Sequence, residues 1–105
     1  MTSVKFLSRN ESLYGFEIKG HSSVNCNDDE GKIVCAAVSS AGYMAANTIT
    51  EIIGDKCDIT VDDALMRVKA INPSREAVIV IEGLKLHLTE LSKQYSKRIK
   101  ITTEV

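Results

Sequence analysis

The chain has 105 residues, with 13 basic and 14 acidic side chains, a formal net charge of −1 and a hydrophobic fraction of 44 %. This length suits one domain with its own core, so we expect a single domain over residues 1–105. Because the charge is balanced, the chain lacks the excess of basic residues that a protein binding nucleic acid or an anionic membrane directly would carry. No apolar run approaches the roughly 20 residues of a membrane helix, and the first residues lack the apolar core of a secretory signal. Three cysteines are an odd number for a disulfide framework, so we expect a cytoplasmic protein with reduced thiols.

The N-terminal segment predicts a β-hairpin. Residues 2–9 alternate weakly between polar and apolar side chains, and residues 12–19 alternate more clearly. The polar residues 9–11 between these two segments supply a turn. Gly20 ends the hairpin, and His21 follows it directly.

A polar, acidic loop is predicted over residues 22–32, because the segment has small side chains and no periodicity. Loops of this length in small domains are frequently functional. Apolar residues at helical spacing then predict a helix over 33–53, with Gly54 as a C-terminal stop. Because this stretch is rich in Ala and Ser and has little charge, we expect most of the helix surface to be buried.

A second hairpin is predicted after this helix. Residues 58–61 form a short strand, and residues 64–71 alternate with Met66, Val68 and Ala70 on one face. The acidic pair at 62–63 supplies the turn between the two strands.

The C-terminal part predicts a long helix and a last strand. Asn72 is a suitable N-cap and Pro73 fits the first helical position, so the helix is expected to run from there to about Ser96. Residues 98–103 predict the final strand. The order ββαββαβ favours an α+β domain, a two-layer sandwich of a mostly antiparallel sheet and two main helices.

Cys35 is the candidate nucleophile. In the predicted helix it lies in the first turn, where unpaired N–H groups and the positive end of the helix dipole favour a thiolate and can hold an oxyanion. The predicted loop can bring His21 close enough to form a Cys/His pair. The alternative is that Cys35 is a small buried residue of an Ala-rich helix.

Other polar residues are weaker candidates. Ser39 lies one helical turn beyond Cys35 and can orient the thiolate or the substrate, but its hydroxyl can equally bond back to its own helix. The acidic run at 27–30 can attract a basic peptide or simply be solvated. We assign no function to Cys26 or Cys57 from the sequence. The sequence has no zinc-ligand spacing and no Gly-rich phosphate loop, so no metal or other cofactor is expected.

Two segments together resemble a known family. Gly20-His21-Ser22 at a strand end, followed after a polar stretch by Ile33-Val34-Cys35-Ala36-Ala37-Val38-Ser39, resembles the signature of the ribosomal-processing cysteine proteases called Prp, also described as YsxB-like. The length, the element order and the long C-terminal helix fit the same family. The combined motif is specific, whereas either half alone is weak.

The resemblance implies a function. Members of this family remove an N-terminal extension from a large-subunit ribosomal protein, number twenty-seven, by cutting after a hydrophobic, Phe-containing stretch. The family's catalytic histidine matches His21 and its nucleophile matches Cys35, while Gly20 and Ser39 match its conserved glycine and serine. Members are homodimers, so the implied partners are the ribosomal protein precursor peptide and a second copy of the chain.

The chain departs from the family pattern at one position. Many members carry an aspartate where this chain has Lys32, so the role of that acid is either missing or taken by Asp28, Asp29 or Glu30.

Three functions therefore stay open. The first is a cysteine endopeptidase, which the resemblance favours. The second is a non-catalytic module that binds a ribosomal protein or peptide. The third is a thiol redox or metal-binding protein, which the scattered positions of the cysteines disfavour.

Overall fold

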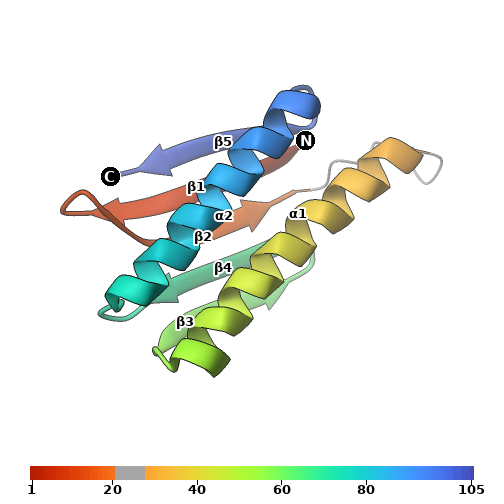
Figure 1. The fold of residues 1–105 in the computed structure, drawn as a ribbon. Coiled ribbons are helices and arrows are strands. Elements are labelled where there is room, and N and C mark those ends of the chain that lie inside the picture. Colours follow the sequence, from red (N-terminus) through yellow and green to blue (C-terminus); the bar gives the residue numbers. More distant parts are fainter. Residues whose placement is uncertain (21–27) are drawn as a thin grey trace.

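The fold is described from a computed structural model, for residues 1–20 and 28–105. Figure 1 shows five strands in one layer and two long helices in a second layer. The elements in chain order are β1 (Thr2–Arg9), β2 (Ser12–Lys19), α1 (Asp29–Asn47), the π-helical turn η1 (Thr48–Ile53), β3 (Cys57–Asp62), β4 (Leu65–Ala70), α2 (Arg75–Gln94) and β5 (Ile99–Glu104).

The sheet has the strand order β3-β4-β2-β1-β5. β1 pairs with β5 in parallel, and the other neighbouring strands pair antiparallel. Both helices lie on the same face of the sheet (Figure 1). The predicted α+β sandwich with the order ββαββαβ is therefore confirmed.

The core lies between the sheet and the two helices. Phe6 and Phe16 are fully buried on neighbouring strands, with ring centroids 6.5 Å apart. The predicted alternation holds on β4, where Met66, Val68 and Ala70 face the core. The apolar stripe of α2 is also buried, at Ala77, Ile81, Leu84 and Leu88. The core thus takes one face of β1, β2 and β4, the start of β5, and one stripe of each helix.

Helix α1 begins earlier than predicted. Asp28 is its N-cap, with a side chain that accepts a hydrogen bond from the Gly31 N–H at 3.1 Å, and Asp29 and Glu30 occupy the first turn. Residues 28–30, interpreted as part of the loop 22–32, are the beginning of this helix, because an Asp cap and acidic residues stabilise a helix N-terminus. Residues 22–27 of that predicted loop lie outside the described residues. Gly54 ends the helix as predicted, with a positive φ of 86°.

The expectation that the helix predicted over 33–53, now α1 and η1, is buried on most of its surface is wrong. Val34, Val38 and Ile49 are buried, but Met44 of α1 is 62 % exposed and Ile52 of η1 is 79 % exposed. One side of the helix packs in the core and the other side is open.

The expectation about membrane segments also needs correction. The continuous helix 29–53 is long and apolar enough, by length and composition alone, to cross a membrane. Weakly polar residues such as Ser, Gly and Thr break up the apolar runs of this helix but lower its mean hydropathy only a little. Its inner face nevertheless packs against the core cluster of the sheet and α2, as the core helix of a globular domain does.

Helix α2 begins later than predicted. Its N-cap is Ser74, whose hydroxyl accepts from the Ala77 N–H at 3.2 Å, and the helix starts at Arg75. Asn72 instead has a φ of +54°, which is the left-handed conformation of a turn residue. A second side chain supports this cap, because Asp55 Oδ2 accepts from the Ser74 N–H at 2.8 Å.

Asp55 links the stability of the fold to pH. The hydrogen bonds from Ser74 hold the pKa of Asp55 below its usual value. A carboxyl with a lowered folded pKa stabilises the fold above its unfolded pKa and loses this effect as the pH falls through the folded pKa. We expect Asp55→Ala to lower Tm at about pH 7 and the difference from wild type to narrow by about pH 2, which thermal unfolding at both pH values measures. An equal difference at both values would contradict this role.

Candidate active site

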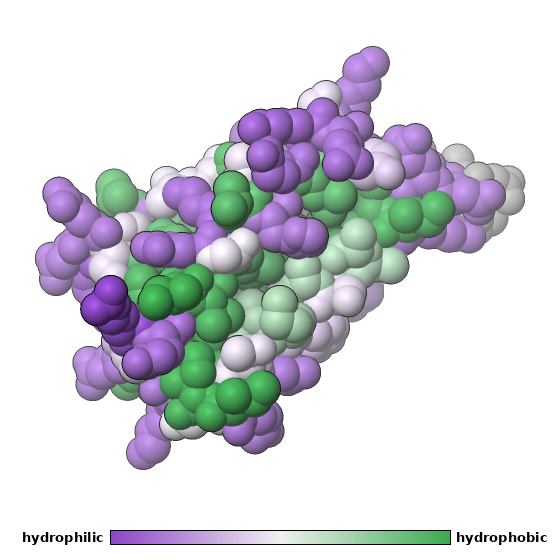
Figure 2. All heavy atoms as spheres, in the orientation of Figure 1, coloured by the Kyte–Doolittle hydropathy of each residue, from purple (hydrophilic) through white to green (hydrophobic). Residues whose placement is uncertain are grey.

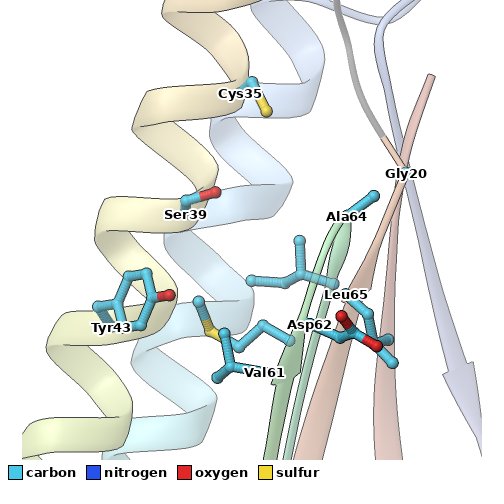
Figure 3. A pocket seen from close by; sticks show the side chains of 10 residues that line it. Gly20, Cys35, Ser39, Tyr43, Val61, Asp62, Ala64 and Leu65 are labelled. Atoms are coloured by element: carbon cyan, nitrogen blue, oxygen red, sulfur yellow. The ribbon is translucent and has the colours of Figure 1, made fainter.

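A pocket of about 120 Å³ lies between α1 and the β3–β4 hairpin. Cys35, Ser39 and Tyr43 line one side of it from successive turns of α1, since residues four apart share a helix face. Figure 3 shows these three side chains on the side of α1 that faces the hairpin. Gly20, at the end of β2, lies across from them. The rest of the lining is the acidic Asp62 and five apolar residues: Ile18, Val61, Ala64, Leu65 and Met66.

The pocket brings together three of the four predicted site residues. Gly20, Cys35 and Ser39 line the same space, although Cys35 and Ser39 follow Gly20 by 15 and 19 positions along the chain.

 The fold closes this gap because the end of β2 lies across the pocket from α1 (Figure 3). His21, the fourth residue, lies outside the described residues, and so does Cys26.

The Cys35 side chain is half-buried and its thiol is free. Its sulfur points towards the pocket in Figure 3. The alternative in which Cys35 is a fully buried core residue does not hold, since the core positions beside it on the helix are Val34 and Val38. A small molecule or peptide that enters the pocket therefore meets the thiol.

The earlier start of α1 changes the expected electrostatics at Cys35. Cys35 lies in the second turn, so its own N–H belongs to the hydrogen-bonded part of the helix and not to the free first turn. The Gly31 N–H of the first turn donates to the Asp28 side chain, and the Lys32 N–H makes the first regular helix bond to the Asp28 carbonyl. The expectation that Cys35 lies in the first turn is therefore wrong, and the role of N–H groups at the helix start in holding an oxyanion stays a prediction.

Gly20 occupies a position that only glycine fits well. Its φ is +90°, and a Cβ at this residue would lie 2.7 Å from the backbone oxygen of Met1. Its N–H donates to the Ala64 carbonyl at 2.8 Å, which ties the end of β2 to the β3–β4 hairpin. The backbone that leads into His21 is thus fixed at Gly20.

Arg98 fixes the other side of the site, at the start of α1. Its guanidinium donates to both carboxylate oxygens of Asp28, at 2.6 and 3.0 Å, and to Glu30 at 2.8 Å. These bonds, first to Asp28 and then to Glu30, raise the pKa of Arg98 above its usual value. The acidic run is therefore partly neutralised within the chain, which weakens the interpretation that it attracts a basic peptide.

The same contacts bear on the departure at Lys32. Of the acids that were candidates to replace the family's aspartate, Asp28 caps α1 and pairs with Arg98, and Glu30 shares the same cation. In the structure, Asp28 and Glu30 therefore stabilise the N-terminus of the helix that carries Cys35.

Removing the Arg98 cation is expected to destabilise the fold. In Arg98→Gln the Asp28 carboxylate, only 13 % exposed, loses its bidentate partner, and an unpaired, largely buried carboxylate is unfavourable. We expect a clear drop in Tm, larger than that of Lys93→Gln, because the Lys93–Glu90 pair is largely exposed. Thermal unfolding of both variants measures the difference, and equal drops would count against the Arg98 contact.

Cys57 differs from Cys35 in its surroundings. It packs against the core, and burial, followed by the charge of Asp55, raises the pKa of its thiol. A raised pKa disfavours the thiolate that a nucleophile or a metal site needs. Within residues 1–20 and 28–105 no group of three or more His, Cys, Asp or Glu side chains is arranged to hold a metal ion.

Sequence reasoning missed several residues of this site. Tyr43 continues the four-residue spacing of Cys35 and Ser39, and that spacing was a signal available in the sequence. Val61 and Asp62 reach the pocket only because the β3–β4 hairpin folds beside α1, and Arg98 comes from the far end of the chain. No local sequence pattern predicts that the β3–β4 hairpin or Arg98 contributes to the site.

The comparison with known families decides the class of protein. The sequence model described as cysteine protease Prp matches residues 1–100. The chain belongs to the Prp family of cysteine proteases. No curated protein matches the chain by sequence.

Solved structures share this fold at low sequence identity. The essential ribosomal processing protease Prp from S. aureus, in complex with a covalently linked product peptide, has a TM-score of 0.87 at 19 % identity, over 99 % of this chain and 100 % of that chain. SMU.848 from Streptococcus mutans has a TM-score of 0.84 at 22 % identity, over 99 % of this chain and 96 % of that chain. These likenesses place the chain in the Prp fold, in agreement with the family match.

Proposed function

We propose that this Prp-family chain removes the N-terminal extension of large-subunit ribosomal protein number twenty-seven, in the cytoplasm, with Cys35 as nucleophile and His21 as its acid–base partner. The observation that carries the proposal is the half-buried Cys35 thiol in a pocket that also contains Gly20 and Ser39. The S. aureus relative is a ribosomal processing protease and has been seen with a covalently linked product peptide, which supports the same chemistry here.

The reaction uses the thiolate of Cys35. Its Sγ forms a bond with the scissile carbonyl carbon, and the carbonyl oxygen takes the negative charge. The carbon–nitrogen bond then breaks as the His21 imidazolium donates its proton to the leaving amine. Neutral His21 next takes a proton from water, which attacks the thioester and releases the extension as a carboxylic acid, and the proton returns to the departing sulfur.

Two pocket residues support this step. Ser39, one helical turn from Cys35, places a hydroxyl along the wall of the pocket where a bound peptide carbonyl can accept a hydrogen bond. Gly20 lets the end of β2 adopt the conformation from which the chain continues into His21. Both are positioning residues in this proposal.

A peptide that spans the extension and the start of the mature ribosomal protein tests the function. We expect one cut, after the hydrophobic stretch, when purified protein and peptide are incubated and the products are identified by mass spectrometry. A peptide whose hydrophobic stretch is replaced by Ser and Gly residues is the control and should stay intact. If the natural peptide binds but is recovered uncut, the chain is a binding module and the proposed reaction is wrong.

We also propose that the chain forms a homodimer through the outer face of its two helices. This face contains a groove of about 580 Å³ between α1 and α2, and Met44 in its wall is largely exposed. Residues 33–50 carry no charge, and Figure 2 shows apolar and weakly polar surface running along α1. An uncharged apolar face suits a second copy of itself, because a two-fold interface places the same patch on both subunits.

The oligomeric state can be changed at this face. We expect light scattering after size exclusion to give a dimer for wild type and a monomer for Met44→Glu, because the introduced charge would be buried in the interface. Ile71→Glu is the matched control, since Ile71 is also exposed but lines a different pocket, to which no helix contributes. A monomeric wild type, or a dimer that survives Met44→Glu, would contradict this interface.

A further inference from the structure

The edge strand β3 is open along one side. In the described part of the chain, β3 is the terminal strand of the sheet and pairs with β4 alone. Such an edge presents unpaired N–H and C=O groups that can pair with another extended chain. Proteins usually shield these edges, so an open one beside a reactive thiol needs a reason.

The register identifies which backbone groups face outward. The Ile71 N–H donates to the Lys56 carbonyl at 2.9 Å, and this pair continues the antiparallel register of β3 with β4. Hydrogen-bonded pairs alternate along an antiparallel ladder, so Asp58 and Thr60 direct their backbone groups to β4. Ile59 and Val61 therefore direct their backbone N–H and C=O groups to the open edge.

The open edge is continuous with the pocket that holds Cys35. Val61 belongs both to β3 and to the pocket wall, on the opposite side from Tyr43 (Figure 3). The side chains of Ile59 and Val61 are 42 % and 52 % exposed. They lie on the helix-facing side of the sheet, because their cross-strand partners Val68 and Met66 are buried there.

The dimensions suit an extended peptide. The eight-residue step from Cys35 to Tyr43 covers about 12 Å of helix. An extended chain advances about 3.3 Å per residue, so a stretch of about four substrate residues fits this length. In an extended chain each carbonyl group is accessible, and a nucleophile at one end of the groove needs access to the carbonyl that it attacks.

We propose that the peptide substrate binds as an added strand on the open edge of β3, paired with the backbone of Ile59 and Val61, and places alternate side chains against α1. This inference rests on the proposed peptidase function and adds its mode of recognition. Backbone pairing supplies affinity that does not depend on side chains, and the apolar pocket beside Tyr43 and Met66 supplies the selection. Every second residue of the substrate then faces the pocket, and the residues between them face solvent.

Substrate peptides with single N-methyl groups test the pairing without changing the protein. Binding is measured with the Cys35→Ser variant by fluorescence anisotropy, so that cleavage does not interfere. Each backbone N–H that donates to β3 should cost about 3- to 10-fold in Kd when methylated, and methylation of the N–H groups between them should have little effect. We therefore expect a two-residue period in Kd along about four residues. A uniform or absent effect would overturn the proposal.

A change in β3 provides the matching experiment on the protein. Ile59→Pro removes one N–H that faces the open edge, and proline is tolerated at such positions of edge strands. We expect about a 3- to 10-fold weaker Kd for the unmodified peptide, with Ile59→Val unchanged because it keeps the backbone donor. If Ile59→Pro converts a dimer to a monomer while Kd stays the same, a second copy occupies the edge and the proposal is wrong.

These outcomes are separate from a failure of the proposed function. If wild type binds the peptide with a two-residue period but never cuts it, the added strand holds and the peptidase does not. If wild type cuts the peptide but no period appears, the peptidase holds and the added strand does not. If Ile59→Pro does not fold, the N-methyl series alone decides the question.

Discussion

Cys35→Ser abolishes peptide cleavage and leaves the fold intact. The serine hydroxyl fits the same space, but a neutral hydroxyl is a far weaker nucleophile than a thiolate. We expect the rate of cleavage to fall by about 10⁴-fold or more, as when the nucleophile of a protease is removed. Rates are measured with the ribosomal precursor peptide, and circular dichroism checks the fold.

Cys57→Ser is the matched control for this loss. Cys57 is also half-buried, but it packs against the core near the start of β3 and is absent from the pocket. It should keep nearly full activity. Cleavage that survives in Cys35→Ser, or that disappears in Cys57→Ser with the fold retained, would assign the chemistry to another residue.

Gly20→Ala destabilises the protein by about 2 to 4 kcal/mol. Two costs act together at this position. The positive φ of 90° is unfavourable for a residue with a Cβ, and the new Cβ would lie 2.7 Å from the Met1 backbone oxygen, so β1 or β2 has to shift. Because Gly20 leads directly into His21, we also expect the rate of cleavage to fall. Urea unfolding and peptide cleavage measure the two effects.

Gly54→Ala separates the two costs. Gly54 has nearly the same φ, 86°, but nothing lies within 4 Å of a Cβ built there. It should therefore lose only the conformational cost, about 1 to 2 kcal/mol, and keep its activity. If both glycine variants lose the same stability, the contact with Met1 is unimportant and the argument for Gly20 is wrong.

Much of the fold could be predicted because strand and helix patterns are local. The alternation of Met66, Val68 and Ala70 marked β4, and Ala77 and Ile81 marked the buried stripe of α2. The strand order of the sheet could not be obtained in this way. The parallel pairing of β1 with β5 joins the two ends of the chain, and no neighbouring residues encode it.

The helix starts were the main errors, and both have a local cause. Residues 28–30 were assigned to a loop because they are polar, although an Asp cap and an acidic first turn also signal a helix start. At the second helix both Asn72 and Ser74 are suitable N-cap residues. The structure uses Ser74, whose N–H donates to Asp55, a residue distant in the sequence. The choice between two caps thus depends on the tertiary fold.

The site could be predicted in part. Cys35 and Ser39 were candidates from their positions in the predicted helix, the family resemblance added Gly20, and the fold places all three at one pocket. Asp62 and Arg98 could not be found, because each meets α1 from an element distant in the sequence. The role of His21 stays a prediction.

Labelling with an electrophilic peptide tests the central claim most directly. A peptide that ends in a chloromethyl ketone after the hydrophobic stretch alkylates the nucleophile as chloride leaves, and the unreactive methyl ketone peptide is the control for the added mass. Trypsin then separates the three thiols, because it cuts after Lys19, Lys32, Lys56 and Arg67 and leaves Cys26, Cys35 and Cys57 on different fragments. We expect the added mass on fragment 33–56 alone, with protection of the thiol by excess substrate peptide. Label on fragment 20–32 or 57–67, or no label in protein that cleaves the substrate, would contradict Cys35 as the nucleophile.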